Sequence, residues 1–394
     1  SIVNDGIARG AFPGCQVLLA KQGRIFFNKA YGKPSFEETI ATGTESIYDL
    51  ASITKIAATT LAVMKLYEEG KISLEDHLEK FLPETKGTNK AHLKIGDILA
   101  HQAGLQDWIP FYKHTLKHHK PDSMFYRNIP SGRFSVPVCR NLYIRDNYHE
   151  VMLEEILRSP LKKEGKYKYS DLGFYLLHIV VERIAEEPFE NYLDKEFYQP
   201  LGLTTMTFNP LEKFPMERIM PTENDQTFRQ QWIRGYVHDP GAAMLGGISG
   251  HAGLFSNARD LAVILQMLLN KGNYGGRQFL TPATVEKFTS TWDPANHNRR
   301  SPGFDKPLPE PSSSGPSCLA ASPLSFGHSG FTGTYVWADP EYDLLYIFLS
   351  NRVCPDATNN KLSGMNIRTN IHQKVYELLI NSETNSLLLQ NESN

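Results

Sequence analysis

The sequence has few of the features that mark nucleic-acid-binding or membrane proteins. Its 394 residues carry a net charge of −2, which gives no electrostatic reason for a nucleic-acid partner. No apolar run approaches the length of a membrane span, and the longest candidate, residues 176–181, is short enough to be a core segment. Hydrophobic residues make up 41% and charged residues 21%, as in soluble globular proteins. We therefore expect no nucleic-acid partner and no membrane span.

Cysteine is also scarce. The four cysteines lie far apart in the sequence and form no C-x-x-C pair. This spacing speaks against a metal cluster or a disulfide framework and favours isolated buried thiols, while the redox compartment stays open. The cysteines are Cys15, Cys139, Cys318 and Cys354.

The N-terminus has neither a starting methionine nor the basic and apolar regions of a signal peptide. Two interpretations stay open: a trimmed mature protein, or one module of a longer protein.

Strand patterns occur at both ends of the chain, and helical patterns lie between them and after the last strand. The predicted strands are residues 16–20, 24–28, 333–338 and 343–349. The predicted helices are residues 52–69, 172–185, 258–269, 282–289 and 367–379.

This order predicts an α+β fold in one catalytic unit, residues 1–394. Antiparallel strands from the two ends join into one sheet, and a mainly helical lobe is inserted between them. The expected lobes are residues 1–50 with 290–385 for the sheet and 51–289 for the helices, with a C-terminal tail at 386–394. A cleft between such lobes is where small-molecule sites tend to form.

Two segments read as loops. Residues 293–323 are too rich in proline for regular structure. Residues 106–148 are rich in aromatic and basic side chains, either as a solvated insertion or as a rim that attracts anionic substrates.

The pair Ser52 and Lys55 can support nucleophilic catalysis. A serine hydroxyl is a poor nucleophile until a base removes its proton. A helix that begins at or just before Ser52 places Lys55 one turn on, beside the hydroxyl. The same helix end offers free N–H groups and a positive dipole end to developing negative charge. The pattern therefore suits acyl transfer, although a serine and a lysine three residues apart also occur commonly by chance.

The neighbourhood of this pair resembles a known family. The segment Asp49-Leu50-Ala51-Ser52-Ile53-Thr54-Lys55 resembles the first motif of the serine β-lactamase and penicillin-binding protein superfamily, in particular its class C-like esterase and D-peptidase branch. The second motif, Tyr-x-Asn, has its counterpart in Tyr169-Ser170-Asp171. The third, Lys-Thr-Gly or His-x-Gly, has its counterpart in His328-Ser329-Gly330. Residues 93–105 and 247–256 also resemble this branch, so the resemblance spans roughly residues 10–380.

The resemblance implies a β-lactamase/transpeptidase-like fold, in which terminal helices flank the sheet, and a role for each motif residue. Ser52 attacks the substrate carbonyl, while Lys55 and Tyr169 share the general-base work on its proton. Tyr169 then gives a proton to the leaving group, which requires nearby positive charge to lower its pKa. The backbone N–H groups of Ser52 and Phe331 form the oxyanion hole. The remaining substrate-binding positions are Asp171, His328, Ser329 and Gly330, and no metal or organic cofactor is implied.

Two positions depart from the family pattern. Asp171 replaces an asparagine, so an ionised side chain that only accepts hydrogen bonds stands where one can also donate. Its charge should favour the protonated form of Lys55 and shift the burden of base to Tyr169. His328 replaces a permanently charged lysine, which reduces affinity for a penicillin-like carboxylate or confines it to mildly acidic pH. Both changes argue against an efficient β-lactamase.

Several side chains also have plain structural interpretations. Tyr169 could be an aromatic that lines the cleft, and His328 a strand histidine with a structural hydrogen bond. His101 and His251 lie in glycine-rich turns, where structural roles are favoured. Three histidines have a spacing that could bind a metal, but with no carboxylate close by in the sequence a solvated loop is favoured. They are His114, His118 and His119.

The leading hypothesis is thus a serine hydrolase of esterase or D-peptidase type, acting on a small ester, peptide or β-lactam-like substrate. The alternatives are a class C-like β-lactamase and a non-catalytic binding or sensing domain with the same fold. By analogy with cell-wall enzymes of the superfamily, we expect an exported or periplasmic bacterial protein.

Overall fold

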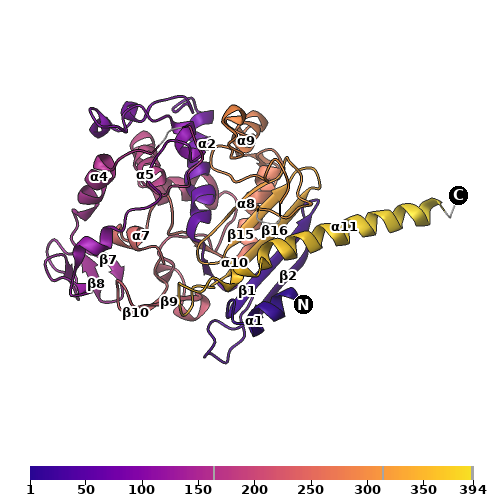
Figure 1. Ribbon diagram of the computed structural model, residues 1–394, viewed down its shortest axis with the longest axis horizontal. Coiled ribbons are helices and arrows are strands. Elements are labelled where there is room, and N and C mark those ends of the chain that lie inside the picture. Colours follow the sequence, from indigo (N-terminus) through magenta and orange to yellow (C-terminus); the bar gives the residue numbers. More distant parts are fainter. Residues whose placement is uncertain (163–164, 313–314, 392–394) are drawn as a thin grey trace.

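The computed structural model describes residues 1–162, 165–312 and 315–391. Its central feature is an antiparallel five-stranded sheet in which strands from both ends of the chain lie side by side (Figure 1). β1 and β16 pair along their length, from Cys15 opposite Ser350 to Lys21 opposite Leu344. The terminal strands therefore join into one sheet as expected. Their spatial order is β14 (Phe326–Ser329), β15 (Tyr335–Asp339), β16 (Leu344–Ser350), β1 (Gly14–Lys21) and β2 (Arg24–Gly32).

The sheet is covered on both faces, because side chains alternate along its strands and both sets are apolar. On one face, Trp337 and Tyr346 pack with the terminal helices α1 (Ile2–Ala8) and α11 (Ile367–Asn391). On the other face, the intervening residues join the main core, and α8 (Ala258–Leu269) contacts β1, β15 and β16. The flanking terminal helices are thus confirmed.

The other helices form a second, mainly helical part beside the sheet (Figure 1). They are α2 (Leu61–Glu68), α3 (Ile95–Leu99), α4 (Tyr148–Arg158), α5 (Leu172–Ala185), α6 (Phe189–Leu193), α7 (Pro240–Met244) and α9 (Pro282–Thr289). A further short helix, α10 (Lys361–Gly364), precedes α11.

Short strands connect these helices. Those with antiparallel partners are β3 (Tyr48–Asp49) with β11 (Phe255–Ser256), β4 (Leu116–Lys117) with β5 (Lys120–Pro121), β9 (Pro221–Asp225) with β10 (Gln231–Arg234), β12 (Asn273–Tyr274) with β13 (Arg277–Gln278), and β8 (Leu142–Ile144) with both β6 (Tyr126–Arg127) and β7 (Val136–Cys139). The basic segment 106–148 therefore contains β4–β8 rather than only loop.

The helix predicted from Ser52 to Glu69 is present, but its winding changes twice. It begins as a 3₁₀ turn at Ala51–Ile53, widens into π-helix at Lys55–Thr60 and continues as α2. Wide turns of this kind interrupt helices mainly at functional sites. Here the change of winding falls on the motif that carries Ser52 and Lys55.

Two expected boundaries are wrong. α8 falls within the predicted helical lobe, 51–289, but packs on the sheet, because its apolar stripe covers a sheet face that would otherwise be exposed. α11 continues to Asn391 rather than ending near residue 379, so it includes most of the expected tail, and its end extends beyond the body of the protein (Figure 1). Residues 392–394 of that tail lie outside the described part.

Two simpler expectations are confirmed. The four cysteines are free and buried. Within the described part of segment 293–323, regular structure is limited to the 3₁₀ turn Pro294–Asn296. Among the described residues, none of the helices combines the length and apolar content that crossing a membrane requires.

Candidate active site

The turn that carries Ser52 is held in a constrained conformation. Ala51, the residue before it, has a φ of +47°, which is uncommon for a residue with a side chain and typical of strained functional turns. The connection between β14 and β15 holds this turn in place. The hydroxyls of Thr332 and Thr334 donate to the carbonyls of Asp49 and Leu50 at 2.7 and 2.9 Å. The segment that follows the third motif therefore also supports the backbone of the nucleophile.

Lys55 lies directly beside Ser52. Its ammonium is fully buried and donates to Ser52 Oγ at 2.9 Å and to the carbonyl of His251 at 3.1 Å, and it forms an ion pair with Asp171 Oδ1 at 2.6 Å. These three contacts match the three donors of an ammonium group. Burial alone lowers the pKa of Lys55, but the negative charge of Asp171, with a smaller effect of Tyr169, raises it above its usual value. The predicted effect of Asp171 on Lys55 is confirmed.

Tyr169 completes the cluster, since its hydroxyl is within hydrogen-bonding reach of Ser52 and Lys55. The proposed role of Tyr169 requires nearby positive charge to lower its pKa, and Lys55 acts in that direction, but the net shift is upward. Burial raises the pKa of Tyr169 and so does Asp171, and the opposing effect of Lys55 is too small to reverse the sign. At neutral pH the phenol is therefore protonated in the resting site.

His328 is neutral rather than partly charged. It is buried on β14, and burial, together with the positive charges of Arg300 and Lys55, lowers its pKa well below the usual value. Its Nδ1 lies 2.7 Å from the Ser329 carbonyl, which can only accept, so Nδ1 carries the hydrogen and Nε2 presents a lone pair. The expected gain of charge at mildly acidic pH is therefore wrong, and a substrate carboxylate meets an acceptor here.

The other residues of the third motif lie around the turn after β14. Gly330 packs so closely on the nucleophile turn that a Cβ would lie 2.6 Å from the Leu50 carbonyl oxygen. Phe331 exposes 54% of its surface, and among the described residues its N–H has no acceptor. This free donor suits the predicted oxyanion role, which remains a prediction.

His101, interpreted from the sequence as structural, makes three contacts with the second motif and the residue before it. Its ring stacks on Tyr169 with centroids 4.4 Å apart, its Nδ1 accepts from the Ser170 N–H at 3.1 Å, and its carbonyl accepts from the Lys168 N–H at 2.7 Å. Burial, followed by the positive charges of Arg300 and Lys55, lowers its pKa well below the usual value, so the ring stays neutral. Its φ of +56° is again unusual for a side-chain-bearing residue.

Replacing His101 with asparagine is expected to lower kcat/KM by about tenfold to a hundredfold, mainly through kcat, because Tyr169 loses its stacking partner and shifts. Asparagine tolerates the left-handed backbone and can still accept from Ser170, so the fold should survive. His119→Asn is the matched control, since His119 is an exposed histidine with a φ of +60°. Steady-state kinetics with circular dichroism check the prediction, and equal losses in both variants would contradict it.

A second buried chain of hydrogen bonds stands behind Lys55. His251 Nε2 lies 2.7 Å from Asp239 Oδ1 and its Nδ1 lies 2.8 Å from Ser249 Oγ. This is a serine, histidine and aspartate in contact, but Ser249 is fully buried and out of reach of a substrate. The chain instead fixes residue 251, whose carbonyl holds Lys55.

Sequence reasoning missed how close His101, His251 and Arg300 come to the motifs. Arg300 lies in the proline-rich segment, and its guanidinium carbon is 6.0 Å from the centre of the Tyr169 ring. Only the glycine-rich settings of His101 and His251 gave a signal, and nothing in the sequence singled out Arg300. The structure also places His114 Nε2 3.5 Å from Glu155, a carboxylate the sequence spacing did not reveal.

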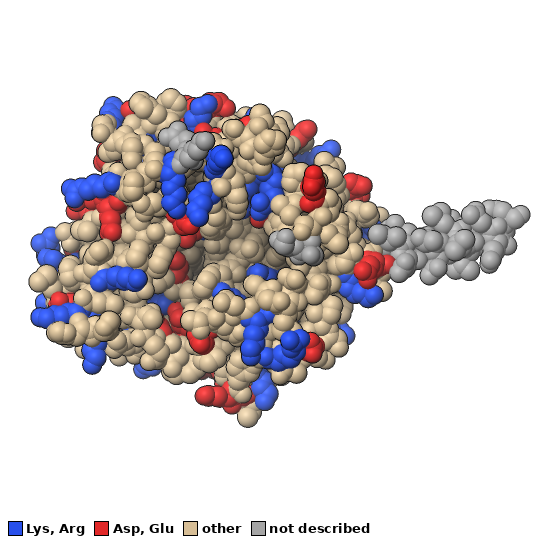
Figure 2. All heavy atoms as spheres, in the orientation of Figure 1, with Lys and Arg blue, Asp and Glu red and all other residues tan. Residues whose placement is uncertain are grey.

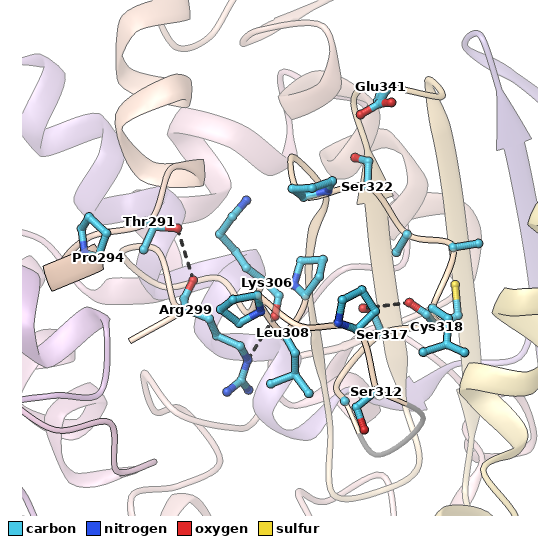
Figure 3. Close-up of a pocket in the computed structure, with 18 of the residues that line it drawn as sticks. Thr291, Pro294, Arg299, Lys306, Leu308, Ser312, Ser317, Cys318, Ser322 and Glu341 are labelled. Carbon is cyan, nitrogen blue, oxygen red and sulfur yellow. Dashed lines mark hydrogen bonds between the residues drawn. The ribbon is translucent and has the colours of Figure 1, made fainter. Parts of the chain in front are cut away.

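The surface is hollowed where the helical part meets the sheet (Figures 1 and 2). A separate cavity of about 680 Å³ lies under the proline-rich segment, lined by residues such as Thr291, Arg299 and Cys318 (Figure 3). None of the motif residues lines this cavity. The large cavity is therefore distinct from the cluster at Ser52.

Comparisons with known proteins agree with the motifs. The model of the Beta-lactamase family matches residues 1–363. A protein of Escherichia coli (strain K12), provisionally named D-alanyl-D-alanine carboxypeptidase, is 33% identical over 380 residues, which cover 86% of this chain and 79% of that protein.

Two solved structures share the fold. The hydrolase EstCE1, described as having promiscuous acyltransferase activity, has a TM-score of 0.65 and 21% identity, covering 93% of this chain and 95% of its own. A class C beta lactamase from Rhodobacter sphaeroides has a TM-score of 0.63 and 16% identity, covering 94% of this chain and 98% of its own.

Proposed function

This chain belongs to the Beta-lactamase family and is a serine hydrolase of that type, and we propose that it acts through an acyl-enzyme on Ser52. The observation that carries the proposal is the contact of Ser52 Oγ with Lys55 Nζ at 2.9 Å, with the Tyr169 hydroxyl in reach of both. Such a cluster supplies a nucleophile, a cation and a proton carrier at one point. The non-catalytic alternative would not need this arrangement.

The protonation states suggest the order of proton transfers. Lys55 already donates a hydrogen to Ser52 Oγ, so in the resting site it is not the base. One proton must first pass from the Lys55–Tyr169 pair to bulk water, which leaves a phenolate held by the ammonium. Ser52 then gives its proton to Tyr169 as Oγ bonds to the substrate carbonyl carbon, and Tyr169 passes that proton to the leaving group as the scissile bond breaks. Water repeats the sequence on the acyl-enzyme and releases the acid.

The developing oxyanion needs donors that are already in place. The N–H groups of Ser52 and Phe331 are the proposed pair, with the Phe331 donor unused by the described part of the chain. One such donor is typically worth about 3 kcal/mol of barrier. The proposed substrate-facing residues are therefore Ser52, Phe331, Ser329 and His328, with Asp171 acting first on Lys55.

We propose esters or D-amino-acid peptides as substrates rather than β-lactams. The carboxypeptidase name of the Escherichia coli relative favours a D-alanyl peptide. Neutral His328 presents a lone pair, and Asp171 is occupied by Lys55, so neither supplies the charge or the amide donor that a penicillin-like acid would use. We place the enzyme outside the cytoplasm, where such peptides occur.

A substrate panel tests this proposal. We expect turnover of a p-nitrophenyl acyl ester and of an N-acylated D-alanyl-D-alanine peptide. We expect kcat/KM for nitrocefin to be at least about tenfold lower than for the ester, which has no carboxylate, because a single missing charge contact costs that much. The same peptide with an amidated C-terminus is the matched control for the carboxylate, and we expect less than a tenfold change. Rapid nitrocefin hydrolysis without ester or peptide cleavage would instead favour the class C-like β-lactamase.

A further inference from the structure

Three side chains that can bind metal lie together on the surface of the helical part. His77 precedes the 3₁₀ turn Leu78–Lys80, Glu79 lies in that turn, and His92 comes from a separate segment. One ligand atom of each lies within 4.8 Å of the other two. Among the side chains that the structure describes, no second group of three histidine, cysteine or acidic residues is set as closely.

The backbone holds these residues in place. The N–H groups of Leu78 and Glu79 donate to the carbonyls of Leu93 and Ala91 at 2.9 and 3.0 Å, and His77 forms an antiparallel bridge with Lys94. The two segments therefore run side by side, which brings Glu79 and His92 opposite each other. The spacing of the ligands depends on hydrogen-bonded backbone rather than on a free loop.

The local charges favour a cation between these three side chains. Glu79 Oε1 lies 3.3 Å from His92 Nδ1, and this is the one ion pair that Glu79 forms with a described residue. The two neighbouring lysines are engaged elsewhere: Lys80 bonds Asp76 and Lys94 bonds Glu75, each at 2.8 Å. The carboxylate of Glu79 thus faces two imidazoles, and the ammonium groups of Lys80 and Lys94 are paired with other carboxylates.

We propose that His77, Glu79 and His92 bind a divalent transition-metal ion of the Zn²⁺ class, with water completing the coordination. Two imidazole nitrogens and one carboxylate oxygen are a ligand set that Zn²⁺ accepts, at about 2.0–2.2 Å from the metal. Both histidines are exposed and Glu79 is half-buried, so small side-chain rotations can close the present spacing without moving the backbone. The ion joins the turn to the segment opposite and stabilises the helical part, independently of Ser52.

Calorimetric titration of untagged, chelator-treated protein with ZnSO4 tests the site. We expect one equivalent to bind to the wild type, and His92→Ala and Glu79→Gln to weaken binding by more than about tenfold, since even loss of an outer-shell partner can cost that much. The thermal unfolding midpoint of the wild type should rise with Zn²⁺, and this rise should be lost in both variants.

The matched control is His114→Ala, which removes an exposed histidine paired with one carboxylate but without a third ligand. It should bind Zn²⁺ as the wild type does. The proposal is overturned if the wild type shows no stoichiometric binding, or if His92→Ala binds as tightly as His114→Ala. Because the His92 side chain is 79% exposed, its replacement should leave folding intact, which circular dichroism without metal verifies.

Discussion

Replacing Ser52 with alanine is expected to lower ester turnover by about 10⁵-fold or more, the scale on which loss of a catalytic nucleophile acts in serine hydrolases. The reason is that the Ser52 hydroxyl is the one to which Lys55 donates among the described serines and threonines. The fold should survive, because the Lys55 ammonium keeps two of its acceptors, the His251 carbonyl and Asp171. Initial rates with a p-nitrophenyl ester, measured beside the thermal midpoint, check both statements.

Covalent labelling gives the same prediction a second readout. A fluorophosphonate probe should form an adduct on the peptide that contains Ser52 and on no peptide of the Ser52→Ala variant. Ser249→Ala is the matched control, because Ser249 contacts a histidine but is fully buried. An adduct on Ser249, or wild-type turnover by Ser52→Ala, would show that the nucleophile is elsewhere.

Replacing Asp171 with asparagine is expected to move the ascending limb of the kcat/KM profile, where activity rises with pH, to lower pH by about one unit or more. Asp171 raises the pKa of Lys55 by stabilising the cation, and raises that of Tyr169 by destabilising the phenolate. Without its charge both groups lose a proton at lower pH, so the phenolate–ammonium form appears earlier. Asparagine keeps an oxygen that can accept from Lys55, so geometry is preserved.

The measurement is kcat/KM between about pH 6 and pH 10 for both proteins, where the apparent pKa belongs to the coupled pair rather than to one residue. Asp107→Asn is the matched control, because this carboxylate is half-exposed and pairs with Lys162 and Lys168 instead. It should leave the profile unchanged. An unchanged or alkaline-shifted profile for Asp171→Asn would contradict the proposed proton path.

Much of the fold was predictable because its elements carry local signals. Short apolar runs on either side of the Gln22-Gly23 turn located the first two strands, helical spacing located α5 and α8, and the Thr281-Pro282 start located α9. Periodicity does not show which other element an apolar face packs against. The apolar stripe of α8 fits a helical core as well as a sheet, and only the assembled structure shows that it covers β1 and β16.

The site was predictable where residue type and order decide the chemistry, and unpredictable where environment does. The motifs brought Ser52, Lys55 and Tyr169 to one point, and the sign of the effect of Asp171 on Lys55 followed from charge alone. The raised pKa of Tyr169 and the neutrality of His328 depend on burial. Burial is a property of the assembled core, to which residues distant in sequence contribute, and it cannot be read from three short motifs.

The pairing of β1 with β16 has a consequence for how the protein is made. Cys15 lies opposite Ser350, so the middle of the sheet joins segments separated by most of the chain. During synthesis β1 and β2 can form only a hairpin with an open edge until the last strand has emerged from the ribosome. Contacts between segments so far apart in the sequence form slowly. Folding of the sheet, and with it the support that Thr332 and Thr334 give to the nucleophile turn, is therefore delayed until β16 has been synthesised.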